Sequence, residues 1–453
     1  MDAQAGVPGA YGRTTARQTE STSAAWIAVT LGVVVVAIAT AGMLRGREPF
    51  ASWYYIFVWY GTLVAADGVV ALTGGAGERG RFLLLDRPAH ALTVLGWSAV
   101  IWFFYELLNF RLQNWYYVFL PNHAGVRWSG TVLSFATVLP AVFLSMAVLR
   151  GLGVARDVRW RPLRVTPRLL TRMQIAGIGM MLLVLVWPRY FFPLVWGATT
   201  FFVEPIVYRK EPRRSLLGDL AEGRPTRLLR LLFGGAAIGL LWELYNVRAR
   251  MKWIYTVPGL EDVKLFEMPV LGFFGFPPFA VECFVLWQAL VVAGVAVPRW
   301  SSARSAPRRR RILAAGAAVA FSILVLVGME ARTVSSLGVR LTDLPGVPAG
   351  TLQAAGFDAF SLAKAESRDV AAVANVADRE ASVWVETARV ATLRGIGAEY
   401  VRVLRDLGIQ SVADLAAQDP ARLTSAVQQA TGRAMPEARV RVWVRGARHE
   451  TVE

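Results

Sequence analysis

Cysteine and histidine are scarce in this sequence, which has one cysteine and three histidines among its 453 residues. The single thiol, Cys283, cannot form an intramolecular disulfide. The histidines do not occur with cysteines at the spacings that zinc or haem sites use. Glycine-rich phosphate loops and serine nucleophile elbows are also missing. The sequence therefore predicts no metal ion, no nucleotide and no other cofactor.

Charged residues are also few. They make up 18% of the chain, whereas hydrophobic residues make up 55%, and the mean hydropathy is +0.42. This composition excludes an ordinary soluble protein of this length. Apolar runs of about 18 residues or more are typical of membrane-spanning helices. We expect an all-α, polytopic membrane bundle with nine spans, near residues 24–44, 52–73, 90–109, 130–149, 172–187, 190–208, 228–246, 269–296 and 312–329.

The segments around these spans divide the chain into parts. The polar first 23 residues predict a disordered tail, and the apolar run after them lacks a cleavage site, which favours a retained span over a signal peptide. The break at Trp187-Pro188-Arg189 predicts a tight hairpin between two spans. The expected parts are a tail at 1–23, a first membrane repeat at 24–150, a basic cytoplasmic loop at 151–171, a second repeat at 172–297, a basic loop at 298–311, the ninth span at 312–329 and a small helical domain at 338–448.

The net charge of +17 is unevenly distributed. Loops 74–90, 150–172, 208–230 and 298–311 hold 23 Lys and Arg residues, whereas the alternate loops 45–52, 111–128, 188–190 and 248–267 hold 9. This bias places the N-terminus and the basic loops in the cytoplasm. Nine spans then place the C-terminal domain outside. The high content of Ala, Arg, Gly and Val fits a bacterial cytoplasmic membrane.

Two stretches of the chain match each other at an offset of 137 residues. The segment WFFYELLNFRLQNWYYVFLP at 102–121 aligns with GLLWELYNVRARMKWIYTVPG at 239–259. Charged, amide and proline positions match in the same register, including Asp67 with Glu204 and Arg87-Pro88 with Arg224-Pro225. The pattern predicts an internal duplication with a parallel arrangement of the halves.

The matched positions supply the candidate site residues. Glu106 and Glu243 each end an apolar run, where an ionised carboxylate costs several kcal/mol. One interpretation is a structural clamp, in which each Glu pairs with the Asn and Arg that follow it. The other is a buried acid that donates a proton or binds a substrate. On the second interpretation, Glu243 and Glu106 are catalytic. The companion residues of a lipid or partner site are Asn109, Arg111, Asn246, Arg248, Trp253 and Tyr255.

Further acids lie in or beside the spans. Asp67 and Glu204 occupy matched positions on the cytoplasmic side, Glu282 lies in the middle of the eighth span, and Glu267 lies at the outer edge of that span. We count them as candidates for the same site, with a structural hydrogen bond as the alternative for Glu282. Pro277-Pro278 should break or kink the helix. The aromatic residues Trp115, Tyr116, Tyr117, Trp253 and Tyr255 fit an interfacial belt.

The segment 187–284 resembles a set of bacterial multi-pass membrane proteins of unassigned function. The resemblance is carried by Trp242-Glu243, Asn246, Lys252-Trp253 and Pro258, followed by the Phe-Glu-Met-Pro stretch that begins at Phe266. A looser similarity is to membrane-embedded lycopene cyclases, which also have duplicated helical units, here with Trp-Glu in place of Trp-Asp. That similarity implies acid-initiated chemistry on a polyene in the bilayer.

The C-terminal domain resembles tandem helix-hairpin-helix domains. One hairpin motif contains Gly395 and Gly397, and an earlier copy contains Gly346 in Leu344-Pro345-Gly346-Val347-Pro348. Hairpin amides in such domains can hold a DNA phosphate. However, residues 332–453 hold 15 basic and 14 acidic residues. Nucleic acid binding is therefore disfavoured, and a protein-docking module is expected.

Four functions remain open from the sequence. The first is a non-enzymatic membrane scaffold that binds lipid or a membrane partner and docks a protein through its C-terminal domain. The second is an acid-dependent membrane enzyme acting on an isoprenoid or another lipid. The third is a transporter, and the fourth is a DNA receptor that uses the C-terminal domain.

Overall fold

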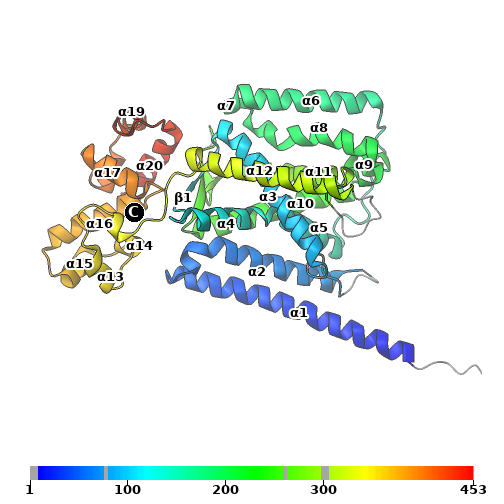
Figure 1. Ribbon diagram of the computed structural model, residues 1–453, viewed down its shortest axis with the longest axis horizontal. Coiled ribbons are helices and arrows are strands. Elements are labelled where there is room, and N and C mark those ends of the chain that lie inside the picture. Colours follow the sequence, from blue (N-terminus) through cyan, green and yellow to red (C-terminus); the bar gives the residue numbers. More distant parts are fainter. Residues whose placement is uncertain (1–8, 76–79, 259–262, 297–305, 452–453) are drawn as a thin grey trace, which may run out of the picture. The chain divides into compact units, whose positions relative to one another are not determined.

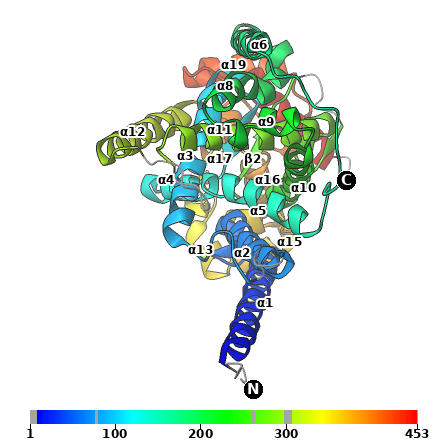
Figure 2. The same ribbon diagram turned by 90° about the vertical axis from the view of Figure 1, so that its right-hand side faces the viewer.

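The computed structural model describes residues 9–75, 80–258, 263–296 and 306–451 (Figures 1 and 2). The fold is all-α, as the sequence predicts. Within the described residues, nine helical segments are long and apolar enough to cross a membrane. They indicate a membrane protein. The chain divides into two units, of which unit 1 comprises residues 1–112, 130–245 and 268–326, and unit 2 comprises 113–129, 246–267 and 327–453.

The candidate spans correspond closely to the predicted ones. They are 22–44 within α1 (Gly9–Leu44), α2 (Phe50–Thr73), α3 (Pro88–Leu112), α4 (Ala124–Phe135) with α5 (Val138–Gly151), α6 (Pro167–Val186), α7 (Pro188–Phe191) with η1 (Phe192–Leu194) and α8 (Val195–Lys210), α10 (Thr226–Arg248), η3 (Val270–Gly275) with α11 (Phe276–Val292), and α12 (Arg308–Arg332). Short helices η2 (Pro212–Arg214) and α9 (Leu216–Ala221) lie between α8 and α10.

Prolines set several of these boundaries. The helix α6 ends at Val186 and α7 begins at Pro188, which confirms the predicted break at that point. Pro277 and Pro278 occupy the first turn of α11, directly after η3. Proline fits a first helical turn because the amide it lacks would have no partner there.

Small residues allow close helix packing in unit 1. The helices α1 and α2 run side by side, as do α6 and α8 (Figure 1). A Cβ atom on Gly32 would lie 2.4 Å from the carbonyl oxygen of Gly61, and one on Gly177 would lie 2.7 Å from that of Ala198. Such close backbone approach is a main source of helix association in lipid, where the hydrophobic effect between helices is absent.

An aromatic cluster fills the interior of unit 1. Ring centroids are 5.4 Å apart for Trp102 and Trp242, 5.7 Å for Trp59 and Trp242, and 5.5 Å for Tyr105 and Trp196. Edge and tilted contacts of this kind add to the free energy of burying the rings. The cluster joins α2, α3, α8 and α10 around the predicted acids.

Unit 2 is built from helices and one small sheet. Strand β1 (Trp115–Val118) pairs antiparallel with β2 (Lys252–Tyr255), with Trp115 opposite Tyr255 and Val118 opposite Lys252. The other short elements of unit 2 are β3 (Lys264–Leu265) and η4 (Leu341–Asp343). Strand β4 (Met268–Pro269) falls in unit 1. The helices of unit 2 are α13 (Ala349–Ala354), α14 (Ala359–Leu362), α15 (Ser367–Ala374), α16 (Asp378–Thr392), α17 (Gly397–Asp406), α18 (Val412–Ala416), α19 (Pro420–Thr431) and α20 (Glu437–Glu450).

The eight helices of unit 2 form two successive groups of four. In each group a glycine with positive φ, Gly356 or Gly408, ends the first helix. A capping box at Asp358 or Ser411 then begins the second helix. The sheet belongs to the same hydrophobic core, because Tyr116, Val118 and Ile254 pack with residues of the helices.

The local structure differs from two expectations. The helix α1 begins at Gly9, within the 1–23 segment of the predicted tail, because Ala, Arg and Gln favour helix and no proline interrupts 9–44. The aromatic residues expected in an interfacial belt instead form β1 and β2, where Trp115, Tyr116 and Tyr117 are buried. Residues 1–8 of the predicted tail and 298–305 of the predicted basic loop lie outside the described residues.

Candidate functional site

Glu282 lies at the centre of a buried network in unit 1. Its carboxylate accepts a hydrogen bond from the hydroxyl of Tyr105 on α3. It also accepts the backbone amides of Thr199 and Thr200 on α8, at 3.0 and 3.2 Å. The side chain is fully buried. Three elements therefore meet at one carboxyl group whose hydrogen bonds are made by the chain itself.

Glu106 and Glu243, the predicted catalytic residues, are both fully buried. The indole nitrogen of Trp102 donates to Glu106 over 3.1 Å, one helical turn away on α3. The ring of Trp242, which directly precedes Glu243, packs against the same Trp102 in a tilted arrangement. The two acids therefore flank the aromatic cluster that fills the interior of unit 1.

Asp67 binds the loop that leads into α3. Its carboxylate accepts the backbone amides of Leu83, Leu84 and Leu85, the last two at 3.0 and 2.9 Å. A carboxylate with three amide donors is well satisfied even when buried. The residue fixes the backbone of the loop between the second and third spans.

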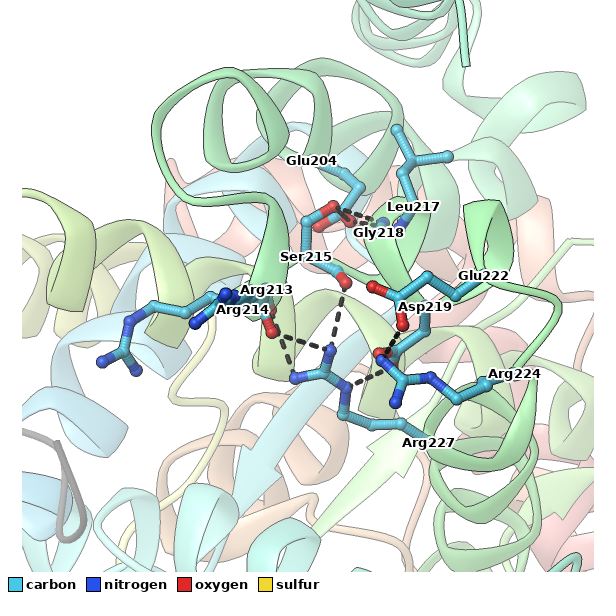
Figure 3. Close-up of polar contacts among 10 residues, drawn as sticks. All are labelled: Glu204, Arg213, Arg214, Ser215, Leu217, Gly218, Asp219, Glu222, Arg224 and Arg227. Atoms are coloured by element: carbon cyan, nitrogen blue, oxygen red, sulfur yellow. Dashed lines mark hydrogen bonds and ion pairs between the residues drawn. The ribbon is translucent and has the colours of Figure 1, made fainter. Parts of the chain in front are cut away.

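Glu204, the counterpart of Asp67, also binds a loop. Its carboxylate accepts the hydroxyl of Ser215 and, at 2.9 Å, the amide of Leu217 (Figure 3). Ser215 in turn caps α9 by accepting the amide of Gly218. The matched acids thus perform the same task, since each anchors the loop that precedes the third helix of its segment.

Arg227 completes this loop structure. Figure 3 shows its guanidinium directed at the backbone carbonyls of Arg213, Arg214 and Ser215 and at the carboxylate of Asp219. The contact with Asp219 is 2.6 Å. The positive charge of Arg227 therefore stabilises the fold of this loop.

The expected pairing of each Glu with the following Arg is wrong for the first segment. Arg111 donates to the carbonyl oxygens of Leu185 and Val186 at the C-terminal end of α6, at 2.9 and 3.2 Å. Cations at this end of a helix satisfy free carbonyls and interact favourably with the helix dipole. Arg248 is exposed, and among the described residues no ion pair joins it to Glu243.

The two asparagines are fully buried. Asn246 makes paired hydrogen bonds to the backbone of Trp253, as its amide donates to the carbonyl at 3.0 Å and its oxygen accepts the N–H at 3.2 Å. This contact fixes the position of β2 after α10. Asn109 occupies the corresponding position before β1 in the sequence.

Glu267 forms an ion cluster inside unit 2. Its carboxylate lies 2.6 Å from the ammonium of Lys252 and 2.9 Å from the guanidinium of Arg394. Burial by itself raises the pKa of Glu267, but Lys252 and Arg394 outweigh it, so that the pKa lies below the ordinary value. We call Glu267, Lys252 and Arg394 the latch, because they join the segment 246–267 to the start of the second hairpin.

The two predicted hairpins have different surroundings. A Cβ atom on Gly395 would lie 2.1 Å from Cγ1 of Val118 in β1, and one on Gly397 would lie 2.7 Å from Cβ of Ser336. Both glycines have positive φ, as does Gly346 in the first hairpin, where a Cβ atom would meet nothing within 4 Å. The second hairpin is therefore covered by the chain itself, whereas the first is open.

The structure thus distributes the predicted residues over separate places. Tyr105, Thr199 and Thr200 complete the Glu282 network, and Lys252 and Arg394 complete the latch; none of these partners was predicted. Of these partners, only Arg394 could have been suggested by the sequence, because it directly precedes the hairpin glycine Gly395. In the part of the chain that the structure describes, no group of His, Cys, Asp and Glu is placed to hold a metal ion.

Comparison with known protein families gave one match, which lies in unit 2. Residues 347–450 match the family of a domain of unknown function, DUF4332. The match spans both groups of four helices and leaves the membrane spans outside. No curated protein and no solved structure matched the chain. The resemblance of the spans to lycopene cyclases therefore has no support beyond the residues that suggested it.

Proposed function

We propose that this chain is a non-enzymatic integral membrane scaffold. In this proposal the helical bundle anchors unit 2, and unit 2 provides a rigid helical surface for a protein partner outside the cytoplasm. The observation that carries the proposal is that three of the acids within the spans are bound by backbone amides of the chain itself. Asp67, Glu204 and Glu282 each accept backbone amides from a second segment.

An acid that performs chemistry needs space beside it for a substrate. Glu282 is bonded by α3 and α8 from its place on α11, and the rings of Trp102 and Trp242 pack against each other between the helices that carry Glu106 and Glu243. Buried carboxyl groups with several donors are typical of structural networks. This argues against the enzyme and transporter alternatives, both of which require an acid that a substrate or ion can reach.

The arrangement of unit 2 supports docking of protein rather than DNA. The amides of a helix-hairpin-helix motif can bind a phosphate only if the hairpin is open. Val118 and Ser336 cover the Gly395–Gly397 hairpin, and Glu267 binds the neighbouring Arg394. In this proposal the hairpin holds strand β1, and unit 2 does not bind nucleic acid.

An internal duplication of the bundle belongs to the same proposal. With an offset of 137, Trp115 corresponds to Lys252 and Val118 to Tyr255, and the observed sheet pairs Trp115 with Tyr255 and Val118 with Lys252. Exchanging each residue with its counterpart in the other half therefore turns one of these pairs into the other, as a two-fold axis between the strands would. The aromatic pairs Trp59–Trp242 and Trp196–Tyr105 exchange under the same offset. Both observations support a two-fold relation between the halves.

The enzyme alternative can be tested on the full-length protein in a mild detergent. Small molecules that co-purify with the wild type and with the Glu106→Gln/Glu243→Gln variant should be identified by mass spectrometry. A scaffold should carry the same bulk phospholipid in both proteins, and the variant should only be less stable. A specific isoprenoid or lipid that is present in the wild type and absent from the variant would replace the scaffold with an enzyme or a lipid-binding protein.

The docking role can be tested in cells with photoreactive amino acids. Val373, Val383 and Leu407 are exposed apolar residues of unit 2, and Leu313 is an exposed residue of a candidate span. We expect a single protein to crosslink to at least one of the three positions and not to Leu313. If none of the three captures a protein, unit 2 is not a docking domain.

A further inference from the structure

Three arginines line one surface cavity of unit 1. The cavity has a volume of about 160 Å³. The basic residues are Arg150 at the end of α5, Arg156 in the turn after it, and Arg230 in α10. Val70, Thr73, Gly74, Gly75, Ala147 and Gly151 complete the lining, which contains no acidic residue. The cavity has room for several water molecules or for one phosphate-sized anion.

The local backbone is built to bring these arginines together. A Cβ atom on Gly151 would lie 2.2 Å from the hydroxyl oxygen of Thr73, so α5 and α2 approach closely here. Gly153 then turns the chain with a φ of +76°. Arg230 is held by a hydrogen bond of 2.8 Å from its Nε to the carbonyl of Val154. The half-buried guanidinium is therefore fixed beside the cavity, while Arg150 and Arg156 are exposed.

The helix ends around the cavity do not neutralise this charge. Three guanidinium groups carry three positive charges, and the C-terminal ends of α2 and α5 contribute about −0.5 each. Arg230 lies near the N-terminus of α10, where the helix dipole adds positive potential and a cation is disfavoured. A lining with three guanidinium groups and no carboxylate suits an anion such as phosphate.

The position of the cavity along the spans defines where the anion would come from. The spans α2 and α5 end at Thr73 and Gly151, and α10 begins at Thr226. The cavity therefore lies at the depth of the lipid headgroups. The surrounding loops 74–90, 150–172 and 208–230 are the basic ones, which the charge bias places on the cytoplasmic side. Anionic lipids attract basic residues at that surface.

We propose that this cavity binds a phosphate group, with Arg150, Arg156 and Arg230 as its ligands. Guanidinium groups bind phosphate through paired, charge-assisted hydrogen bonds. The group belongs either to an anionic lipid headgroup or to a soluble phosphate. The site is independent of protein docking by unit 2, so each can fail without the other.

The test uses full-length protein in a neutral detergent. Native mass spectrometry measures retention of phosphatidylglycerol against phosphatidylcholine, and thermal unfolding measures stabilisation by inorganic phosphate. The cavity variant is Arg150→Gln/Arg156→Gln. The matched control is Arg161→Gln/Arg164→Gln, which removes the same charge from exposed residues of the same loop that do not line the cavity.

We expect the cavity variant to bind the anion roughly thirtyfold more weakly and the control to stay within about twofold of the wild type. Retention of phosphatidylglycerol without an effect of inorganic phosphate identifies a lipid ligand, and stabilisation by inorganic phosphate identifies a soluble one. Should the cavity variant misfold, Arg150→Lys/Arg156→Lys keeps the charge and must bind the anion more weakly than the wild type. Equal losses in the cavity variant and the control, or the absence of both effects in the wild type, would overturn the proposal.

Discussion

Burying a carboxylate in hydrocarbon costs several kcal/mol, and hydrogen bonds from backbone amides offset this cost in unit 1. Asp67 receives three amides, Glu282 receives two amides and a phenol, and Glu204 receives an amide and a hydroxyl. Each donor belongs to a segment other than the helix that carries the acid. At the scale of single residues, these acids therefore hold loops and helices together.

Removing the Glu282 carboxyl should destabilise the protein strongly. The substitution Glu282→Ala leaves two amides and the Tyr105 hydroxyl without an acceptor, which we expect to cost about 3 kcal/mol or more of unfolding free energy. Glu282→Gln retains an acceptor oxygen and should cost about 1 kcal/mol. Denaturant titration in detergent, followed by tryptophan fluorescence, measures both. An alanine variant as stable as the wild type would show that the network does not stabilise the fold.

The hairpin glycines should respond differently to the same substitution. Gly395→Ala and Gly346→Ala both place a side chain at positive φ, which costs about 1–2 kcal/mol. Only Gly395→Ala also collides with Val118, so it should lose clearly more stability, and Val118→Ala in the same chain should recover part of that loss. Thermal unfolding of the variants measures the difference. Equal losses at the two glycines would mean that β1 does not cover the second hairpin.

At the scale of secondary-structure elements, the short strands β1 and β2 and their contacts with helices shape unit 2. The strands β1 and β2 follow α3 and α10 in the chain and pair with each other inside unit 2. Several contacts attach them to the helices of that unit. The guanidinium of Arg439 on α20 lies 4.9 Å above the ring of Tyr116, and the latch joins Lys252 of β2 to Arg394. Unit 2 therefore depends on segments from three regions of the sequence.

The latch should make the stability of unit 2 sensitive to acid. The pKa of Glu267 is below its ordinary value of 4.5 in the folded protein. The stabilisation is therefore complete above about pH 4.5 and is lost as the pH falls through the folded pKa. The difference in stability between the wild type and Glu267→Gln, measured by limited proteolysis from pH 7 to pH 3, should shrink over that range. Because the other acids are common to both proteins, a difference that stays constant would contradict the role of the latch.

At the scale of the whole molecule, the residues that the structure describes contain nine candidate spans, and the charge of the chain is unevenly distributed. An odd number of spans places the two ends of a chain on opposite sides of a membrane. The Lys and Arg bias of the loops predicts a cytoplasmic N-terminus. On the proposed topology the C-terminal unit lies outside, on the side where we propose that it binds a protein.

Reporter fusions test this topology. A fluorescent protein that folds only in the cytoplasm should be active when fused after Arg164, in a basic loop. Alkaline phosphatase, which is active only outside the cytoplasm, should be active when fused after Glu453. The exchanged fusions serve as controls and should be inactive. Cytoplasmic activity at both positions would require an even number of spans.

The sequence alone determined the all-α class, the nine candidate spans found in the described part of the chain, and the break at Trp187-Pro188. These features follow from the local apolar pattern and from proline, which act within one segment. The tertiary structure decided which groups satisfy the acids, because Glu282 meets Tyr105 across 177 residues and Glu267 meets Arg394 across 127. It also decided that aromatic residues suited to a membrane interface form β1 and β2. Their strand conformation is stabilised by a partner strand far away in the chain, and no local pattern specifies that partner.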